Sequence, residues 1–535
     1  MKEIIKKAIE KTLAENNIEF SGEIKIEIPT NKANGDYSSN IAMQLAKELK
    51  SSPLNIATML VDKINDDKIA KVEVANPGFI NFFVDKEYLL DNINHVIKEG
   101  ANYGKSRAGA NKKVNVEFVS ANPTGLIHIG TSRNAAYGDN ISRILEFAGY
   151  KVTREYYFND GGVQIENLGK STKARYLELC EKEVEFPENG YHGMEIKDIA
   201  KEIMGKYKDT KLNENIEYFS KYASGYLIEI IKQDLSDFRV KFDVWTKEQD
   251  IRNSGKIEKS LEILKNKNDI YELEGATWLA SSKYGDDKDR VVIKTDGNYT
   301  YLVPDIAYHL DKINRGYDEI VDVLGADHHG YINRLKASVE ALGFDPNKIH
   351  IKMIQMVKLL RDGEEVKMSK RTGQTVTMRE LMDDVGINAA RYFFASRSND
   401  TQMDFDLDLA KKTSSENPVF YVSYAYARIC TILKEQELTE IKKYKTIKES
   451  DAYNVLMQVY NFQEIVEIAA EKKLPHLITN YVYELANLFH TFYSKYRIIV
   501  PDKQKTQENL NMINAIKITI NNALNLIGVE PPERM

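Results

Sequence analysis

The chain has 535 residues and a mass of 61.2 kDa, which is too long for a single hydrophobic core and predicts several domains. Its 74 Lys and Arg residues are outnumbered by 80 Asp and Glu residues, and the formal net charge of −6 excludes a protein that is attracted to polyanions as a whole. Only Cys180 and Cys430 occur, outside any CxxC pattern, which argues against a disulfide framework or a structural zinc site and fits a reducing cytoplasm. The first residues predict a charged amphipathic helix, and no later stretch approaches 18 apolar residues. We therefore expect neither a signal peptide nor a membrane span.

Residues 1–110 are expected to form a small α+β domain. A helix precedes a strand in which Ile24, Ile26 and Ile28 alternate with polar residues. A second helix follows a glycine-containing loop, and residues 71–84 read as two strands around the turn-forming sequence NPG.

Residues 113–133 (KVNVEFVSANPTGLIHIGTSR) hold the main functional signal of the chain. Apolar and polar residues alternate up to Phe118, turn formers follow, and helical spacing then continues to Gly149. Residues 150–158 read as another strand, which completes a βαβ unit. Its first crossover loop lies at the edge where open parallel sheets bind nucleotides.

This loop combines a histidine, a glycine and a hydroxyl at the start of a helix. The free amides of a helix N-terminus attract anions, Gly130 lets a phosphate or ribose approach the backbone, and His128 can donate to a phosphate oxygen. Neither a GxGxxG fingerprint nor a P-loop is present, since the stretch GANYGKS at 100–106 has the wrong spacing.

Downstream, residues 170–275 are rich in charge and tyrosine and predict a helical insertion between two halves of the sheet. The second half is expected to begin near Ala276, with strands over 290–294 and 319–324. The latter strand ends in the polar sequence GADHHG, which is how such sheets build sites at their carboxyl edge. Adjacent histidines diverge, so we expect this sequence to bind adenosine or an amino acid substrate and not a metal.

The sequence KMSKR at 367–371 follows a turn at Asp362 and Gly363 and predicts a mobile basic loop. Thr377 and Glu380 form a capping box for the next helix. From about residue 410 the spacing is helical to the end, and most of the many aromatic residues there are expected in the core, with some left exposed for base stacking.

The sequences HIGT and KMSKR, in that order, resemble the HIGH and KMSKS signatures of class I aminoacyl-tRNA synthetases. The sequences VANPGFINFF, YFNDGG, LVPDIAYH, GADHHG, NPVFYVSYAYARICTIL and GVEPPERM resemble arginyl-tRNA synthetases over almost the whole chain. The resemblance implies a multidomain protein: an N-terminal α+β domain that contacts tRNA (1–110), a Rossmann-like α/β catalytic domain (111–400) with its helical insertion, and an all-α C-terminal bundle that binds the anticodon (410–535).

The resemblance also implies an arginine–tRNA ligase. ATP with Mg²⁺ activates L-arginine to arginyl-adenylate, and the 3′-terminal adenosine of tRNA(Arg) then takes the arginyl group. We expect a cytoplasmic monomer with no tightly bound cofactor, no metal ligands of its own, and no DNA or membrane partner. In this family, activation commonly waits for tRNA.

Residue by residue, the resemblance implies four sets of contacts. The catalytic set is His128, Thr131, Lys367 and Lys370. The ATP-binding set is Thr124, Gly125, His128, Gly130, Thr131, Met368, Ser369 and Lys370. The arginine-binding set is Glu117, Ser120, Asn122, His128, Tyr301, Asp305, Asp327 and His328, since a carboxylate accepts the paired donors of a guanidinium. The tRNA-binding set is Asn81, Tyr426 and Met535.

Several alternatives stay open. Asn81 could be an outward-facing strand residue, Glu117 a solvated strand position, and Asp305 a helix cap. Thr131 stands where the family signature has its second histidine, so the chain could be a catalytically silent tRNA-binding relative. A third reading is another HxGH nucleotidylyltransferase, which the long helical C-terminal region disfavours.

Overall fold

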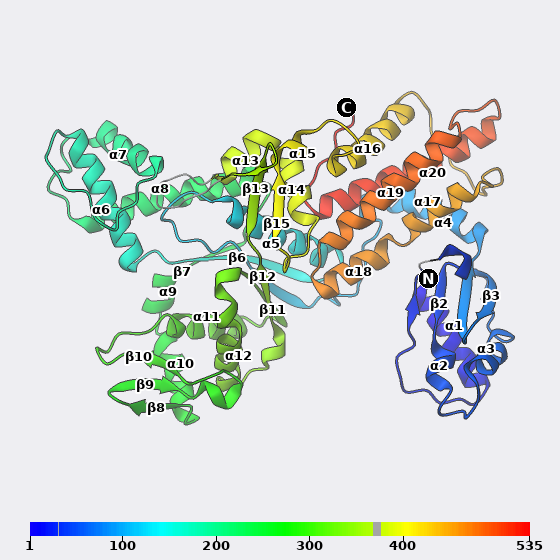
Figure 1. Cartoon of the computed structure of the whole chain (residues 1–535), viewed down its shortest axis with the longest axis horizontal. Coiled ribbons are helices and arrows are strands. Elements are labelled where there is room, and N and C mark those ends of the chain that lie inside the picture. The colour runs from blue at the N-terminus through cyan, green and yellow to red at the C-terminus, as the bar shows by residue number, and fades with distance from the viewer. Residues whose placement is uncertain (30, 367–375) are drawn as a thin grey trace. The chain divides into compact units, whose positions relative to one another are not determined.

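The computed structural model describes residues 1–29, 31–366 and 376–535, and all their side chains except those of residues 32 and 327–329. The chain folds into two compact units. Unit 1 comprises residues 1–101, 432–461 and 488–518, and unit 2 comprises residues 102–431, 462–487 and 519–535. Figure 1 traces the elements along the chain.

Unit 1 contains a four-stranded antiparallel sheet of order β1-β2-β4-β3. The expected hairpin over residues 71–84 is confirmed, because β3 and β4 pair on either side of the sequence NPG. The expected alternating strand is shorter than predicted: β1 covers only Ile26–Glu27, and Ile28 is 50 % exposed. The elements of this part are α1 (Lys2–Glu15), β1 (Ile26–Glu27), η1 (Lys32–Asn34), β2 (Tyr37–Ser39), α2 (Ile41–Leu45), α3 (Pro53–Val61), β3 (Ile69–Ala75), β4 (Phe79–Val84), α4 (Lys86–Glu99) and α17 (Ser450–Tyr460).

Unit 2 is organised on a five-stranded parallel sheet of order β12-β11-β5-β6-β7. Val114 and Val116 of the central strand are fully buried, as expected for a strand covered on both faces. The helix after this strand ends before Gly149, whose φ of +90° suits a residue without a side chain. The predicted βαβ unit is therefore confirmed. Its elements and the remaining strands of the sheet are β5 (Lys113–Glu117), α5 (Ile129–Phe147), β6 (Lys151–Phe158), β7 (Val244–Lys247), β11 (Glu319–Gly325) and β12 (Ile349–Ile354).

Two expectations about the middle of the chain are wrong. The stretch 170–275 is not a purely helical insertion, because β7 lies within it and pairs with β6 at the edge of the central sheet. Residues 276–293 do not belong to the central sheet, because β8 (Ile270–Leu273), β9 (Ala276–Leu279) and β10 (Arg290–Ile293) form a separate antiparallel sheet. Four-residue strands such as β7 carry too little alternation to reveal their partner, which tertiary pairing selects.

The remaining elements of unit 2 surround these sheets, and α6, α7 and α8 form a helical group of their own around buried apolar residues (Figure 1). They are η2 (Gly100–Asn102), α6 (Gly162–Leu179), α7 (Met194–Tyr207), α8 (Ile216–Asp237), α9 (Glu248–Asn253), α10 (Lys256–Asn266), β8 (Ile270–Leu273), β9 (Ala276–Leu279), η3 (Ser281–Tyr284), β10 (Arg290–Ile293), α11 (Leu302–Asn314), η4 (Ala326–Tyr331), α12 (Ile332–Ala341), η5 (Pro346–Lys348), β13 (Val357–Arg361), β14 (Glu364–Glu365), α13 (Met378–Val385), α14 (Ile387–Ala395), β15 (Met403–Asp406), α15 (Leu407–Lys411), α16 (Pro418–Lys434) and α18 (Phe462–Lys472). Like η2 and α16, the helices α19 (His476–Lys495) and α20 (Lys503–Leu526) contribute residues to both units.

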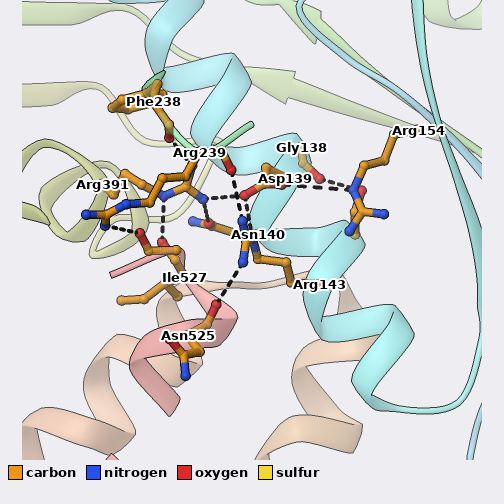
Figure 2. Close-up of polar contacts among 12 residues, drawn as sticks. Gly138, Asp139, Asn140, Arg143, Arg154, Phe238, Arg239, Arg391, Asn525 and Ile527 are labelled. Atoms are coloured by element: carbon orange, nitrogen blue, oxygen red, sulfur yellow. Dashed lines mark hydrogen bonds and ion pairs between the residues drawn. The ribbon is translucent and has the colours of Figure 1, made fainter. Parts of the chain in front are cut away.

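A buried arginine ties the C-terminal segment of unit 2 to the middle of α5 (Figure 2). The fully buried Arg391 donates to Asp139 and to Asn140 on α5, and to the carbonyl oxygens of Phe238 and Ile527. Burial lowers the pKa of Arg391 to about 10, although Asp139 opposes that shift. A charged group in such a place is tolerated because each of its three nitrogens donates at least one hydrogen bond and Asp139 supplies the counter-charge.

The architecture confirms the predicted fold class, an α/β catalytic domain joined to an N-terminal α+β domain and a helical C-terminal region. Among the helices of the described residues, none combines the length and the apolar character that a membrane crossing requires.

Candidate active site

A strained turn shapes the end of the central strand. Val119 and Ser120, which follow Phe118 after the end of β5, have φ of +68° and +41°. A β-branched residue such as Val119 rarely occupies this region. The backbone N–H of Val119 donates to Asn134 Oδ1 on α5 at 2.7 Å, which fixes the turn. The consequence is that the Ser120 hydroxyl points back and donates to Glu117 Oε1 at 2.9 Å.

Glu117 is buried at the carboxyl end of β5, with 8 % of its surface exposed. Its Oε1 accepts from Ser120, and its Oε2 accepts from Lys312 of α11. The alternative of a solvated strand position is therefore wrong. Buried carboxylates are tolerated when paired, so Lys312 supplies the counter-charge that this position needs.

Asp305 lies in the first turn of α11 and is partly buried. It does not cap the helix: Tyr301 occupies the N-cap position, and the Asp305 carboxylate accepts from the Tyr331 hydroxyl. Burial raises the pKa of Asp305 to about 6, the Tyr331 hydrogen bond and His309 lower it, and Glu117 raises it further. A cation bound beside Asp305 would therefore stabilise its charged form. Tyr301 itself is 83 % exposed and is available to a ligand.

The HIGT sequence begins α5. His128 is the N-cap residue of the helix, and its Nε2 lies 3.3 Å from Thr131 Oγ1. A Cβ on Gly130 would lie 3.2 Å from His128 Cε1, so a side chain at this position would crowd the imidazole ring. Gly130 and Thr131 follow in the first turn of α5, where backbone amides favour an anion.

The loop after β5 is fixed to the loop after β6. Asn122 Oδ1 accepts from the backbone N–H of Asn159 at 3.0 Å, and Asn122 Nδ2 donates to Gln164 at 2.9 Å. The partly buried Thr124 and Gly125 follow in the same loop. Asn122 therefore joins the loop after β5 to the loop after β6 and to the first turn of α6.

Backbone pairing joins the HIGT sequence to the segment that follows KMSKR. His128 and Thr377 form an isolated antiparallel bridge, the Ile129 N–H donates to the carbonyl of Val376 at 3.1 Å, and the Met378 N–H donates to that of Ile127 at 2.7 Å. Residues Lys367, Met368, Ser369 and Lys370 lie outside the described residues, as do the side chains of Asp327 and His328. The predicted capping box of Thr377 and Glu380 is confirmed.

The candidate tRNA-binding residues have different surroundings. Asn81 is not an outward-facing residue: it is 5 % exposed, and its Oδ1 accepts from the Ser38 hydroxyl at 2.8 Å. Tyr426 is half-buried, and burial together with Cys430 and Glu533 raises the pKa of its hydroxyl to about 12. Met535 is 53 % exposed.

The sequence did not predict two buried cationic side chains near the site, those of Arg133 and Lys312. Arg133 donates to the carbonyl oxygens of Gln355, Ser398 and Thr401. These bonds anchor the start of α5 to the connection between β12 and β13 and to the segment between α14 and β15. Lys312 is fully buried beside Glu117. The signal for Lys312 was its spacing, because an acid, a histidine and a lysine at i, i+4 and i+7 on an apolar helix share one face.

Comparisons with known proteins agree with this geometry. Residues 92–417 match the model of tRNA synthetases class I (R), catalytic domain; residues 1–84 match the arginyl tRNA synthetase N terminal domain, and residues 422–535 match the DALR anticodon binding domain. The chain is 47 % identical over 550 residues to the arginine–tRNA ligase of Bacillus licheniformis, covering 100 % of this chain and 99 % of the relative. It is 49 % identical over 524 residues to that of Shouchella clausii, covering 96 % and 94 %.

A solved structure supports the fold. The arginyl-tRNA synthetase of Thermus thermophilus superposes with a TM-score of 0.80 at 21 % identity, covering 99 % of each chain. Matches of this extent, on a chain whose central sheet carries HIGT at the expected edge, exclude the reading as another HxGH nucleotidylyltransferase. The chain belongs to the class I arginyl-tRNA synthetase family and is an ATP-using arginine–tRNA ligase.

Proposed function

We propose that arginine is bound at the carboxyl edge of the central sheet between Glu117 and Asp305. The observation that carries the proposal is the pair itself: two inward-lying carboxylates, one at the end of β5 and one at the start of α11, close enough for Glu117 to raise the pKa of Asp305. A guanidinium presents a planar fork of donors that suits such acceptors.

In this proposal the two carboxylates have different roles in binding arginine. Both oxygens of Glu117 already accept hydrogen bonds, from Ser120 and Lys312, whereas Asp305 accepts one described side-chain bond, from Tyr331. Asp305 therefore takes the guanidinium in this proposal. Glu117 and Ser120 line the same pocket, with Asn122, His128, Tyr301, Asp327 and His328 as the other proposed contacts.

ATP is proposed to lie along the HIGT sequence. The Gly130 and Thr131 amides in the first turn of α5 and the His128 side chain are proposed to meet the phosphates, since the Ile129 N–H already donates to the Val376 carbonyl; Gly130 lets the phosphates approach. Thr131 replaces an imidazole but retains a hydroxyl donor 3.3 Å from His128 Nε2, which favours an active enzyme over a silent relative. Thr124, Gly125, Met368 and Ser369 complete the proposed ATP contacts.

The chemistry requires alignment and charge stabilisation. The arginine carboxylate attacks the α-phosphate, a C–O–P bond forms, and pyrophosphate leaves with the electron pair of the broken P–O bond. Lys370, with Lys367, is proposed to neutralise the charge that develops on pyrophosphate. ATP is proposed to enter as its magnesium complex, with the ion held chiefly by the phosphates. Among the described side chains, no group of three His, Cys, Asp or Glu residues is arranged to hold a metal.

Contacts with tRNA are proposed at Tyr426 and Met535, since an aromatic ring and a half-exposed thioether can pack on unstacked bases. A contact at Asn81 requires its hydrogen bond with Ser38 to open. We also propose that activation waits for tRNA, and that the enzyme works as a monomer in the cytoplasm. Light scattering of the purified enzyme tests the monomer.

The experiment that tests the site is arginine-dependent ATP–pyrophosphate exchange, with and without tRNA(Arg) and with lysine in place of arginine. Wild-type enzyme should exchange only with arginine and tRNA. Lys370→Ala should reduce exchange by about 10²-fold or more. The matched control is Lys358→Ala, a half-exposed lysine on β13 that pairs only loosely with Glu365 at 3.8 Å. Equal exchange by wild type and Lys370→Ala would refute the proposed role of Lys370.

A further inference from the structure

One face of α11 carries three ionisable residues in register. Asp305, His309 and Lys312 are spaced by four and three positions, so they lie on the same side of the helix. His309 is 5 % exposed and Lys312 is fully buried. A buried lysine is rare because removing its charge from water is costly, so its surroundings must compensate.

Lys312 joins two neighbouring strands of the central sheet. Its Nζ donates to Asp322 Oδ1 on β11 at 2.8 Å and to Glu117 Oε2 on β5, and lies 4.5 Å from the centre of the Tyr308 ring. Glu117 and Asp322 are direct register partners in the parallel pair of β5 and β11. Lys312 thus bridges two carboxylates that would otherwise repel each other across adjacent strands.

The network continues to the other candidate arginine ligand. His309 Nε2 lies 2.9 Å from Asp322 Oδ2, and its Nδ1 lies 2.8 Å from the carbonyl oxygen of Asp305. Burial lowers the pKa of His309, but Asp322 outweighs it and the net shift is upward. Burial raises the pKa of Asp322, yet Lys312 and His309 hold it well below the ordinary value. Polar contacts therefore run without a break from the first turn of α11 to Glu117.

We propose that Lys312 is a positioning residue for arginine selection: it fixes Glu117 directly, it fixes the first turn of α11 through Asp322 and His309, and it supplies the counter-charge of Glu117. The inference rests on the proposed assignment of Glu117 and Asp305 as arginine ligands. In this proposal Lys312 acts through Glu117 and does not itself contact arginine.

The charged groups around Lys312 determine how its removal should change the pH dependence of arginine binding. The groups that surround Glu117, Asp305 and Lys312 come from β6, α9, α11, β11 and η4. They are Glu155, Tyr157, Glu248, Tyr308, His309, Asp322 and Tyr331, and Arg315 pairs with Glu155. Acidic groups dominate this set. Removing Lys312 makes proton uptake by the carboxylates easier, and a protonated carboxyl cannot accept the paired donors of a guanidinium.

The test compares Lys312→Met, Lys312→Arg and the control Lys256→Met in aminoacylation. Lys256 forms a partly exposed ion pair with Asp311 on the outside of the same helix. Lys312→Met should raise KM for arginine at least about tenfold while KM for ATP stays within about twofold. The acid limb of kcat/KM for arginine should move to higher pH, and Lys312→Arg, which retains the charge, should restore part of the loss. Lys256→Met should behave as wild type, and an unchanged KM for arginine in Lys312→Met would overturn the inference.

A double variant separates positioning from stability. Lys312→Met/Asp322→Asn removes the unpaired carboxylate that the single variant leaves behind, so the thermal midpoint should recover. KM for arginine should stay raised, because Glu117 still lacks its cation. If both the thermal midpoint and KM for arginine returned to the wild-type values, Lys312 would have only a structural role, and the inference would be overturned. Glu117→Gln, measured alongside, tests the underlying assignment: an unchanged KM for arginine there would refute the proposed arginine site itself.

Discussion

His128 and Thr377 lie opposite one another in an antiparallel bridge, although 249 positions apart in the numbering. The two flanking backbone hydrogen bonds, at 3.1 and 2.7 Å, attach the segment after KMSKR to the start of α5. One end of the segment that contains Lys370 is therefore fixed against HIGT by the backbone. This anchoring gives the proposed phosphate contacts a common frame.

Replacing Thr377 with Val should weaken this anchor. The change removes the hydroxyl that accepts from the Glu380 N–H and should cost about 1 kcal/mol at the N-terminus of α13. We expect a several-fold lower kcat in aminoacylation with KM for arginine unchanged, because the proposed arginine contacts are Glu117 and Asp305 and not α13. Ser52→Ala removes a comparable cap from α3 in unit 1 and serves as the control. Equal losses of kcat in both variants would show that cap loss in general, and not this anchor, is responsible.

The pH dependence of arginine binding should follow Asp305. Since burial raises its pKa to about 6, the carboxylate gains a proton as pH falls through 6 and loses its capacity as a double acceptor. KM for arginine should rise below that pH and stay level above it. Tyr331→Phe removes a hydrogen bond that lowers this pKa, so the acid limb should move to higher pH.

The matching controls are Asp305→Asn and Tyr284→Phe. Asp305→Asn should have a high KM for arginine with no acid limb of this origin. Tyr284→Phe also deprives a carboxylate, Asp269, of a hydroxyl donor at 2.8 Å, outside the proposed pocket, and should leave the profile unchanged. An acid limb that stays in place in Tyr331→Phe would contradict the role of Asp305.

A pH-dependent contribution to stability should come from Glu319. Its hydrogen bond with His350 lowers its pKa from 4.5 to about 2, burial opposes the shift, and the nearly buried Lys473 adds to it at 3.1 Å. A carboxyl with a depressed pKa in the folded state stabilises fully above the unfolded value, and that stabilisation is lost as pH falls from about 4.5 to 2. Glu319→Gln should cost roughly 1–2 kcal/mol at pH 7 and progressively less below pH 4.5.

Thermal midpoints of wild type and Glu319→Gln between pH 3 and 7 measure this effect, with the exposed Glu365→Gln as control. The difference between wild type and Glu319→Gln should shrink with acid, whereas Glu365→Gln should differ little at any pH. A difference that is constant over the whole range would mean that the ion pair contributes nothing to it.

Docking of the C-terminal segment should depend on Arg391. Arg391→Met leaves Asp139 with only Arg143 and Arg154 near it and should destabilise unit 2 by about 3–5 kcal/mol. Gly528 has a φ of +68°, and a Cβ there would lie 2.0 Å from Arg391 Nε, so Gly528→Ala should also be destabilising. Urea unfolding monitored by tryptophan fluorescence measures both changes.

The control for Gly528→Ala is the same substitution at Gly225. This glycine lies within α8 and has open space where its Cβ would be. Gly225→Ala should stabilise the enzyme by roughly 0.5–1 kcal/mol, because alanine loses less backbone entropy in a helix. The two substitutions should therefore act in opposite directions. A neutral Gly528→Ala would show that the C-terminal segment moves away from Arg391 without cost.

The sequence alone determined the features that depend on local spacing and chemistry. Alternation before Phe118, turn formers after it and helical spacing to Gly149 predicted β5, the site loop and α5, because period and turn chemistry are local properties. The capping box of Thr377 is equally local. The family assignment followed from short sequences that resemble arginyl-tRNA synthetases, and the comparisons confirm it.

Tertiary structure decided which polar residues meet. The sequence showed a glutamate, a lysine and an aspartate at positions 117, 312 and 322, but their joining in one buried cluster depends on the register of β5 with β11 and on the face that α11 turns to the sheet. The same holds for β7, a four-residue strand whose membership of the central sheet comes from pairing with β6. Contacts between residues far apart in the chain are selected by the free energy of the whole fold, and no local pattern records that selection.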